Sequence, residues 1–198
     1  MNERLESAAS ALRARGYEAS VFATAAEASE FILRDLKQAQ TVAIGGCMTA
    51  KQMNLKAQLL EKGHTVLWHW EGDSLRDAMN AQAYICSANA LTDSGMIVQI
   101  DGTGNRVAAL CYGPSVAYLV VGRNKLVAGG YAQAVARIKQ VACPLNARRI
   151  GLNTPCSKND VCNPAACERP MCNVFLAMEH PPTSKRVHVL LIDEDLGY

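Results

Sequence analysis

Segments with helical and with strand-like hydrophobic spacing alternate from the start of the chain, and this alternation constrains the fold more than any other feature of the sequence. Residues 3–15 place Leu5, Ala8 and Leu12 at helical spacing, whereas residues 41–44 form the short apolar run typical of a buried strand. Elements that alternate in this way usually pack as layers of helices against a sheet. The pattern therefore predicts a layered α/β fold.

Local signals set the expected boundaries of the elements. The sequence from Thr24 to Glu27 is a capping box that opens a helix, and Gly16 closes the helix before it. We expect helices over residues 3–15, 24–36, 49–61, 73–80, 106–110, 131–141 and 145–151. We expect strands over residues 17–22, 41–44, 64–68, 83–86, 116–121, 125–127 and 187–192, and a hairpin formed by residues 89–92 and 96–100.

The bulk properties favour a single domain over residues 1–198. The hydrophobic content is 49%, the charged content is 19% and the net charge is +2, which is typical of a globular protein. A nearly neutral chain lacks the basic surface that nucleic-acid binding requires. The N-terminus shows no secretory signal, and the most apolar stretch, residues 107–121, is too short to span a bilayer. We therefore expect a cytoplasmic protein without nucleic-acid or membrane partners, whose oligomeric state the sequence leaves open.

Residues 152–185 differ in character from the rest of the chain. They show little hydrophobic periodicity and contain a cluster of cysteines among the prolines Pro155, Pro164, Pro170 and Pro181. A loop of this length inside a compact domain usually has a function. We interpret residues 152–185 as a metal-binding, cysteine-rich loop, followed by a final strand.

Four of the eight cysteines lie close together near the C-terminus. A reducing compartment disfavours disulfides, so clustered cysteines there indicate metal binding or redox chemistry. The spacing C-x5-C-x4-C-x4-C is nearly even, and the prolines between the cysteines are expected to keep the backbone out of helix, so that the segment can wrap around one centre. The expected metal ligands are Cys156, Cys162, Cys167 and Cys172.

The even spacing favours an iron–sulfur cluster, of the 4Fe-4S type, over a single zinc ion. Structural zinc sites usually present two separate pairs of cysteines, two to four residues apart within a pair. Neither common ferredoxin spacing is matched, however, so zinc remains the alternative. Buried thiols that only pack are the explanation without a metal, and we expect that role for Cys86, Cys111 and Cys143, which lie in apolar segments.

Two glycine-rich loops each follow a strand and lead towards a helix. Glycine lets the backbone approach a ligand closely, and the free N–H groups at a helix N-terminus attract anions. Ligands of α/β sheets collect at the carboxyl ends of the strands. The two loops therefore predict a site for a small anionic metabolite, with a carboxylate or a phosphate, formed by Gly45, Gly46, Thr49, Asn89, Gly102, Thr103, Gly104 and Asn105.

The candidate catalytic residues are Asp101, Asn105, Arg106 and Cys47, which are the reactive or polar side chains of these loops. Arg106 would form a fork on a carboxylate or phosphate. For Cys47 we expect a buried structural role, and a reactive role is the alternative, because the thiol precedes a helix N-terminus whose dipole would lower its pKa. The aromatic segment 68–70 is expected to be a half-buried strand end.

Several segments together resemble the lactate-utilization (LUD) domain family. The matching segments are residues 45–49 (GGCMT), 87–95 (SANALTDSG), 101–109 (DGTGNRVAA), 144–147, 154–156 and 194–198. The resemblance implies a three-layer α/β/α sandwich with a mainly parallel sheet, like the NagB/RpiA/CoA-transferase group. It also implies a link to iron–sulfur-dependent L-lactate oxidation, in which relatives work with an oxidoreductase partner subunit.

The sequence leaves three functional hypotheses. The leading one is an iron–sulfur metalloenzyme, or enzyme subunit, that acts on a small carboxylate or a phosphate-bearing metabolite. The second is a non-enzymatic electron-transfer or accessory subunit, and the third is a zinc-stapled ligand-binding module. The sequence lacks a dinucleotide-binding fingerprint, because the pattern after Asp101 has no third glycine, so we do not expect NAD to bind.

Overall fold

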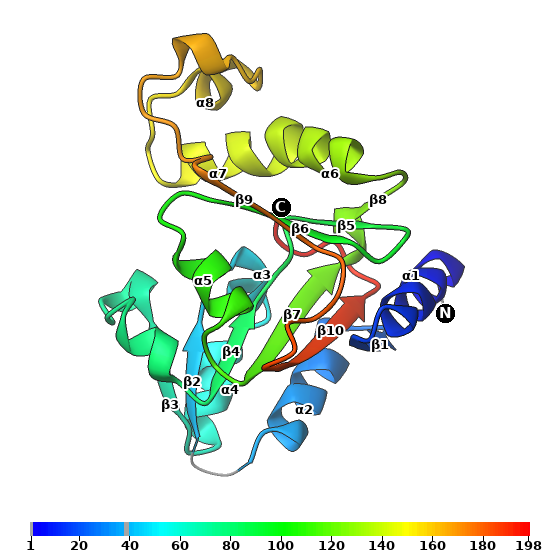
Figure 1. Ribbon diagram of the computed structural model, residues 1–198. Helices are drawn as coiled ribbons and strands as arrows, with labels where there is room; N and C mark the ends of the chain where they lie inside the picture. Colours follow the sequence, from blue (N-terminus) through cyan, green and yellow to red (C-terminus); the bar gives the residue numbers. More distant parts are fainter. Residues whose placement is uncertain (1, 38–39) are drawn as a thin grey trace.

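The computed structural model describes residues 2–37 and 40–198, in which a six-stranded sheet carries helices on both faces (Figure 1). All neighbouring strands of this central sheet pair in parallel. In spatial order the strands are β1 (Glu18–Phe22), β10 (Arg186–Ile192), β7 (Val116–Gly122), β4 (Ala83–Cys86), β2 (Thr41–Ile44) and β3 (Thr65–Trp68). This arrangement confirms the three-layer α/β/α fold with a mainly parallel sheet.

The strands are apolar on both faces because helices cover both. In β2, Ala43 packs into one hydrophobic cluster, whereas Val42 and Ile44 pack into the cluster on the other face. Central strands of parallel sheets therefore read as continuous apolar runs rather than alternating ones. The first face carries α1 (Glu3–Ala14) and α5 (Asn105–Cys111), and the second carries α2 (Ala25–Asp35), α3 (Met48–Gln52) and α4 (Leu55–Glu61).

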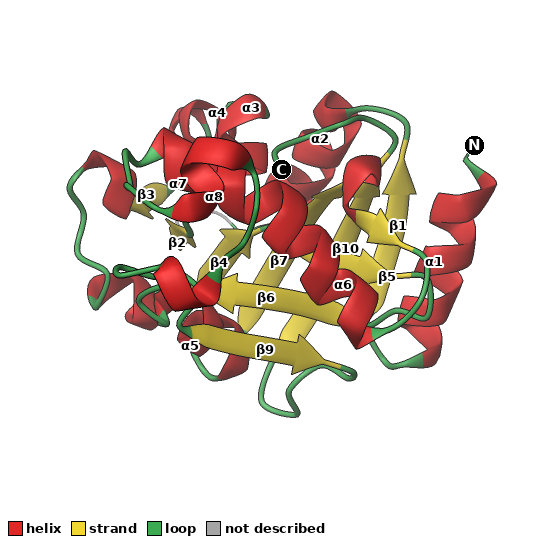
Figure 2. Cartoon of the chain, turned by 90° about the horizontal axis from the view of Figure 1, so that it is seen from above, coloured by secondary structure: helices red, strands yellow, loops and turns green. Residues whose placement is uncertain are grey.

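A second, smaller sheet lies across the end of the central sheet at which the strands finish (Figure 1). One of its faces contributes Leu91 and Ile97 to the first cluster, and its other face packs Ala90 and Val98 under a long helical rod. Figure 2 shows this rod crossing over β6. The sheet consists of β8 (Leu126–Val127), β5 (Ala90–Thr92), β6 (Ile97–Asp101) and β9 (Val174–Met178), and the rod of α6 (Tyr131–Arg137), a π-helical stretch (Ile138–Ala142) and α7 (Cys143–Arg149).

Two expected helices are shorter than the sequence predicted. The helix over residues 49–61 is divided into α3 and α4 at Asn54, which adopts a left-handed conformation with φ of 51°. The helix over residues 73–80 is reduced to a 3-10 turn, Asp77–Asn80. Asp73, the first residue of the expected helix, instead accepts a hydrogen bond from the backbone N–H of Trp68 (2.7 Å), which holds this segment against the end of β3.

The cysteine-rich loop also contains more regular structure than expected. A short helix, α8 (Pro155–Asn159), begins at Thr154, whose side chain accepts a hydrogen bond from the Ser157 N–H. Pro155 occupies the first helical position, where its missing N–H is tolerated. Strand β9 pairs antiparallel with β6 and ends the loop. The prediction that prolines keep this whole segment out of helix was therefore wrong.

The two helices expected over residues 131–141 and 145–151 form one rod. Pro144 cannot donate a backbone hydrogen bond, and the rod widens to the π form at Ile138–Ala142, just before it. The rod thereby continues over the ends of the central strands as far as Arg149. Within residues 2–37 and 40–198, no helix is both long enough and apolar enough to cross a membrane.

Gly122, the last residue of β7, packs closely against the C-terminal segment, and substituting it would test this contact. A β-carbon at Gly122 would lie within 3.0 Å of Asn124 Oδ1, the Leu196 backbone nitrogen and the Glu194 carbonyl oxygen. We expect Gly122→Ala to lower the free energy of unfolding by about 1–3 kcal/mol, because backbone atoms would have to move. The matched control is Gly130→Ala, since the nearest atom to its β-carbon lies 4.0 Å away, and an equal loss there would contradict this explanation. Chemical denaturation measures both.

Candidate functional site

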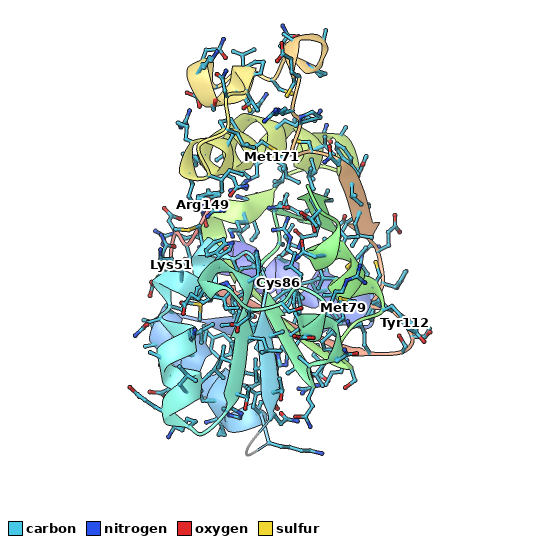
Figure 3. All side chains as sticks on the ribbon, turned by 90° about the vertical axis from the view of Figure 1, so that its left-hand side faces the viewer. Lys51, Met79, Cys86, Tyr112, Arg149 and Met171 are labelled. Atoms are coloured by element: carbon cyan, nitrogen blue, oxygen red, sulfur yellow. The ribbon has the colours of Figure 1, made fainter. Side chains whose placement is uncertain are left out.

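A cavity of about 470 Å³ lies where four parallel strands end. Its floor comes from the residues that follow β2, β3, β4 and β7, one side from the loop after β6, and its roof from the helical rod. Arg149, at the end of the rod, and Met171, in the cysteine-rich loop, line the cavity, and both lie above the central sheet (Figure 3). The two glycine loops do meet here, as the sequence predicted.

The first loop brings its backbone against the aromatic wall of the cavity. A β-carbon on Gly46 would lie 3.3 Å from Trp70 Nε1, so a larger residue would crowd the indole. A β-carbon on Gly45 would overlap the Tyr84 hydroxyl, and this glycine therefore serves packing beneath the cavity. Gly46 lines the cavity, whereas Gly45 and Thr49 lie behind the lining.

Cys47 does not have the activated thiol that its position suggested. Its side chain is 3% exposed, and its Sγ accepts a hydrogen bond from the backbone N–H of Ala50 (3.3 Å). Burial raises the pKa of the Cys47 thiol, and this effect outweighs the nearby Lys125 charge. The prediction of a lowered pKa was wrong because α3 is a helix of five residues and the thiol is desolvated.

The second loop is held by Asp101. Its carboxylate accepts hydrogen bonds from the backbone N–H groups of Arg106 (2.9 Å) and Val107 (3.2 Å), which are the free donors of the first turn of α5. Gly104 begins this helix with φ of 86°. Gly102, Thr103 and Asn105 line the cavity together with Asp101, whereas Gly104 does not.

Arg106 lies in the cavity wall with part of its guanidinium unused. Its Nη2 donates to the Ile100 carbonyl (2.7 Å) and to Asn89 Oδ1 (3.1 Å). Its Nε is buried without a hydrogen-bond partner, and no ion pair involves it within the described residues. A buried donor without a partner is uncommon and costs free energy in the folded state.

Lys125 is a cavity residue that the sequence analysis placed only in a strand. It follows β7, is 3% exposed, and donates to Ser87 Oγ (2.7 Å) and Thr49 Oγ1 (2.9 Å). Burial lowers the pKa of Lys125 to about 8. A lysine that precedes a short strand carries no motif, so no signal in the sequence separated it from a surface lysine.

Arg149 and Tyr198 were also missed, and both line the cavity. The Arg149 guanidinium lies over the Trp70 ring at 4.2 Å from its centroid, and its Nε donates to the Tyr198 hydroxyl (2.8 Å). The segment 68–70 is therefore part of the site: Trp68 is buried, while His69 and Trp70 line the cavity. Burial and the Arg149 charge lower the pKa of His69, which favours its neutral form at pH 7.

The charges around the cavity do not balance. Lys125, Arg106 and Arg149 line it, and the acidic residue among the lining, Asp101, is already occupied by the N–H groups of α5. Cationic side chains that no carboxylate neutralises make a cavity attractive to anions. The arrangement can bind a carboxylate or a phosphate.

The cysteine-rich loop forms a second cavity of about 190 Å³. The four expected ligands line it, and so does Cys143 from the start of α7. Cys143 Sγ lies 3.3 Å from Cys172 Sγ, and this contact lowers the pKa of the Cys172 thiol. Cys143 packs in a buried cluster as expected, but it also belongs to the thiol group, which its distance in sequence concealed. In the described part of the chain, no three Cys, His, Asp or Glu side chains converge as they would on a single metal ion.

The two cavities share a wall. Cys143 and Met171 line both of them, so the thiol group lies directly beside the cationic cavity. The carbonyl oxygen of Met171 also lies against Gly102, at 3.2 Å from the position of a β-carbon there. A larger residue at this glycine would push the cysteine loop away from the second glycine loop.

Comparison with known proteins identifies the family. The profile of the family described as LUD domain matches residues 5–192. The chain belongs to the LUD domain family. A crystal structure of a DUF162 family protein from Deinococcus radiodurans, determined at 1.70 Å resolution, is similar to this LUD domain with a TM-score of 0.58 and 18% sequence identity over 96% of each chain. At this identity the likeness concerns the fold alone. A comparison with curated proteins gave no match.

Burial of the Lys125 amine predicts that this LUD domain has a lower free energy of unfolding than it would have with an apolar side chain at this position. Lowering a lysine pKa from 10.5 to about 8 costs about 3 kcal/mol when the amine is charged. Because the folded-state pKa is lowered, the cost is fully present below pH 8 and disappears as the pH rises towards 10.5. Lys125→Met should therefore stabilise the protein by about 1–2 kcal/mol at pH 7, allowing for lost hydrogen bonds, and by less at pH 10.

Thermal and denaturant unfolding at pH 7 and pH 10 would measure this difference. The control is Lys51→Met on the exposed side of α3 (Figure 3), which should leave stability unchanged at both pH values. A clear loss of stability in Lys125→Met at pH 7 would contradict the assignment of an uncompensated buried amine.

Proposed function

We propose that this protein is a LUD-family iron–sulfur protein that acts, as an enzyme or enzyme subunit, on a small carboxylate or phosphate-bearing metabolite. The observation that carries the proposal is the shared wall, in which Cys143 and Met171 line both the thiol cavity and the cationic cavity. A ligand bound by the cationic side chains would lie next to a centre held by the thiols. Binding and chemistry would then occur in adjacent places.

Three features support the binding of an anion. Arg106 has a buried Nε without a partner, Arg149 is held on the face of Trp70, and Lys125 is buried without a carboxylate in the described part of the chain. The cavity also lies at the carboxyl ends of parallel strands, where ligands of α/β proteins collect. A carboxylate or phosphate would satisfy the free donors that the protein leaves open.

The thiols support a centre larger than one ion. Cys143, Cys156, Cys162, Cys167 and Cys172 surround a hollow of about 190 Å³ rather than converging on one point. Thiolates are the ligands of iron–sulfur clusters, and a hollow lined by cysteines on several sides fits a cluster of four irons better than a single zinc. When bound, such a centre would supply electron transfer, or Lewis acidity at an iron that lacks a fourth thiolate.

The family name directs the choice of ligand. Lactate utilization would require a small hydroxy acid, which carries the carboxylate that Arg106 and Arg149 favour. The aromatic and apolar lining from Trp70, Ile100 and Ile138 would contact its carbon chain. Lactate is therefore the first ligand to test, and other small hydroxy acids follow.

The accessory-subunit hypothesis is favoured by a different observation. The region around the thiol cavity exposes several large apolar side chains, and such surfaces often bind another protein. These are Val141, Leu145, Ile150, Val161 and Phe175. An oxidoreductase partner docked there would exchange electrons with the centre, and the cationic cavity would then bind that partner's substrate or product.

The proposal predicts the metal content. Protein purified or reconstituted without oxygen should be brown and contain about four iron and four sulfide ions per chain. Serine in place of Cys156, Cys162, Cys167 or Cys172 should lower the iron content, while Cys111→Ser, outside the thiol cavity, should leave it unchanged. A colourless protein with one zinc would instead support the zinc-stapled module.

Because the two cavities share a wall, we expect an anion bound in one to affect a metal centre held in the other. Addition of L-lactate or sulfate should change the electron paramagnetic resonance spectrum of the reduced protein, because the anion would bind beside the centre. Arg106→Gln should weaken binding of the anion by about 10–100-fold, as expected for loss of a charged donor, and leave iron content unchanged. Binding of the anion without any spectral change would contradict the proposed adjacency.

A further inference from the structure

We propose that Lys125 is an anion-binding residue of the cavity and that it takes up a proton when the anion binds. This inference rests on the anion site of the proposed function and deepens it. It assigns the site a ligand with two features: a charged group for the guanidiniums, and a further oxygen acceptor for the amine. A hydroxy acid and an oxyanion such as sulfate both have them.

The hydrogen bonds of Lys125, which lines the cavity, leave one N–H of its amine without an acceptor. A lysine ammonium has three N–H donors, and Lys125 uses two of them on Ser87 Oγ (2.7 Å) and Thr49 Oγ1 (2.9 Å). Among the described residues Lys125 Nζ donates no third hydrogen bond, and the side chain lines the cavity. Thr49 Oγ1 in turn donates to the Leu196 carbonyl (3.2 Å), so the hydroxyl that holds the amine is itself fixed.

Burial above all, and then two nearby guanidiniums, oppose protonation of Lys125 when the cavity holds no anion. Two guanidiniums repel the ammonium: that of Arg106 in the cavity wall and that of Arg137, which donates to the carbonyl oxygens of Asn89 (2.7 Å) and Asn124 (3.0 Å). The thiols of Cys47, which caps α3, and of Cys86, at the end of β4, lie near it, and burial raises the pKa of both, to about 12 for Cys86. They stay neutral near pH 8.

An anion in the cavity would reverse this balance. Its negative charge lies beside the amine in a desolvated place, where opposite charges favour protonation. The pKa of Lys125 therefore rises on binding, from a starting value near 8. Above pH 8 the empty protein lacks the proton and the complex holds it, so binding takes up a proton from the solvent. The affinity should consequently fall as the pH rises.

Calorimetric titration of the whole protein at pH 7 and pH 9 would measure this coupling. Sulfate and L-lactate are the probes because neither titrates in this range. We expect about tenfold weaker binding at pH 9 than at pH 7, and an uptake approaching one proton per anion at pH 9, obtained from buffers of different ionisation enthalpy. Lys125→Met should bind more weakly at pH 7, show no proton uptake, and have the same affinity at both pH values.

Two controls separate the possible explanations. Ser87→Ala removes a hydroxyl but keeps the amine, so it should retain proton uptake, and thermal unfolding would establish that each variant is folded. Proton uptake that persists in folded Lys125→Met, or binding by the wild type that is independent of pH, would overturn the role of Lys125 and leave the anion site standing. Absence of binding of either probe at both pH values would overturn the anion site itself.

Discussion

All six strands of the central sheet run in the same direction, and the rest of the molecule depends on this constraint. Their carboxyl ends lie at one edge, where each chain segment must turn away and leaves backbone and polar side chains near its neighbours. The segments after β2, β3, β4 and β7 therefore contribute to one cavity. The second sheet and the helical rod close over this edge and turn an open crevice into a lined space.

The parts of the site that could be predicted are those marked by a pattern among residues close together in the sequence. The glycine loops are recognisable because glycines between a strand and a helix indicate a possible anion site, and the loops at Gly46 and Gly102 do line the same cavity. The same holds for the even spacing of the cysteines between residues 156 and 172. The α/β layers follow from hydrophobic period alone, which is why the central strands were placed correctly whereas the edge strand β9, in a loop without clear periodicity, was missed.

The parts that could not be predicted depend on contacts between distant segments. Cys143 joins the thiol group only because the rod carries it to within 3.3 Å of Cys172. The hydrogen-bond partners of the buried Lys125 likewise come from distant segments, Thr49 from α3 and Ser87 from the residues after β4. The Cys47 thiol shows the converse error. A local rule about helix N-termini predicted a lowered pKa, but the fold buries the sulfur, and desolvation raises it instead.

Binding of an anion would explain why the protein keeps buried cationic groups at this edge, although they destabilise the fold. A buried amine and a guanidinium nitrogen without a partner each oppose folding, and an apolar cavity lining would avoid that cost. The same uncompensated charge would bind an entering anion more strongly than water does, because the protein has already desolvated the donors and fixed them in place. The groups that oppose folding of the empty protein are therefore also those expected to favour binding. An anion in the cavity would then stabilise the folded protein by neutralising this charge, and it would do so beside the thiol of Cys143, which lines both cavities.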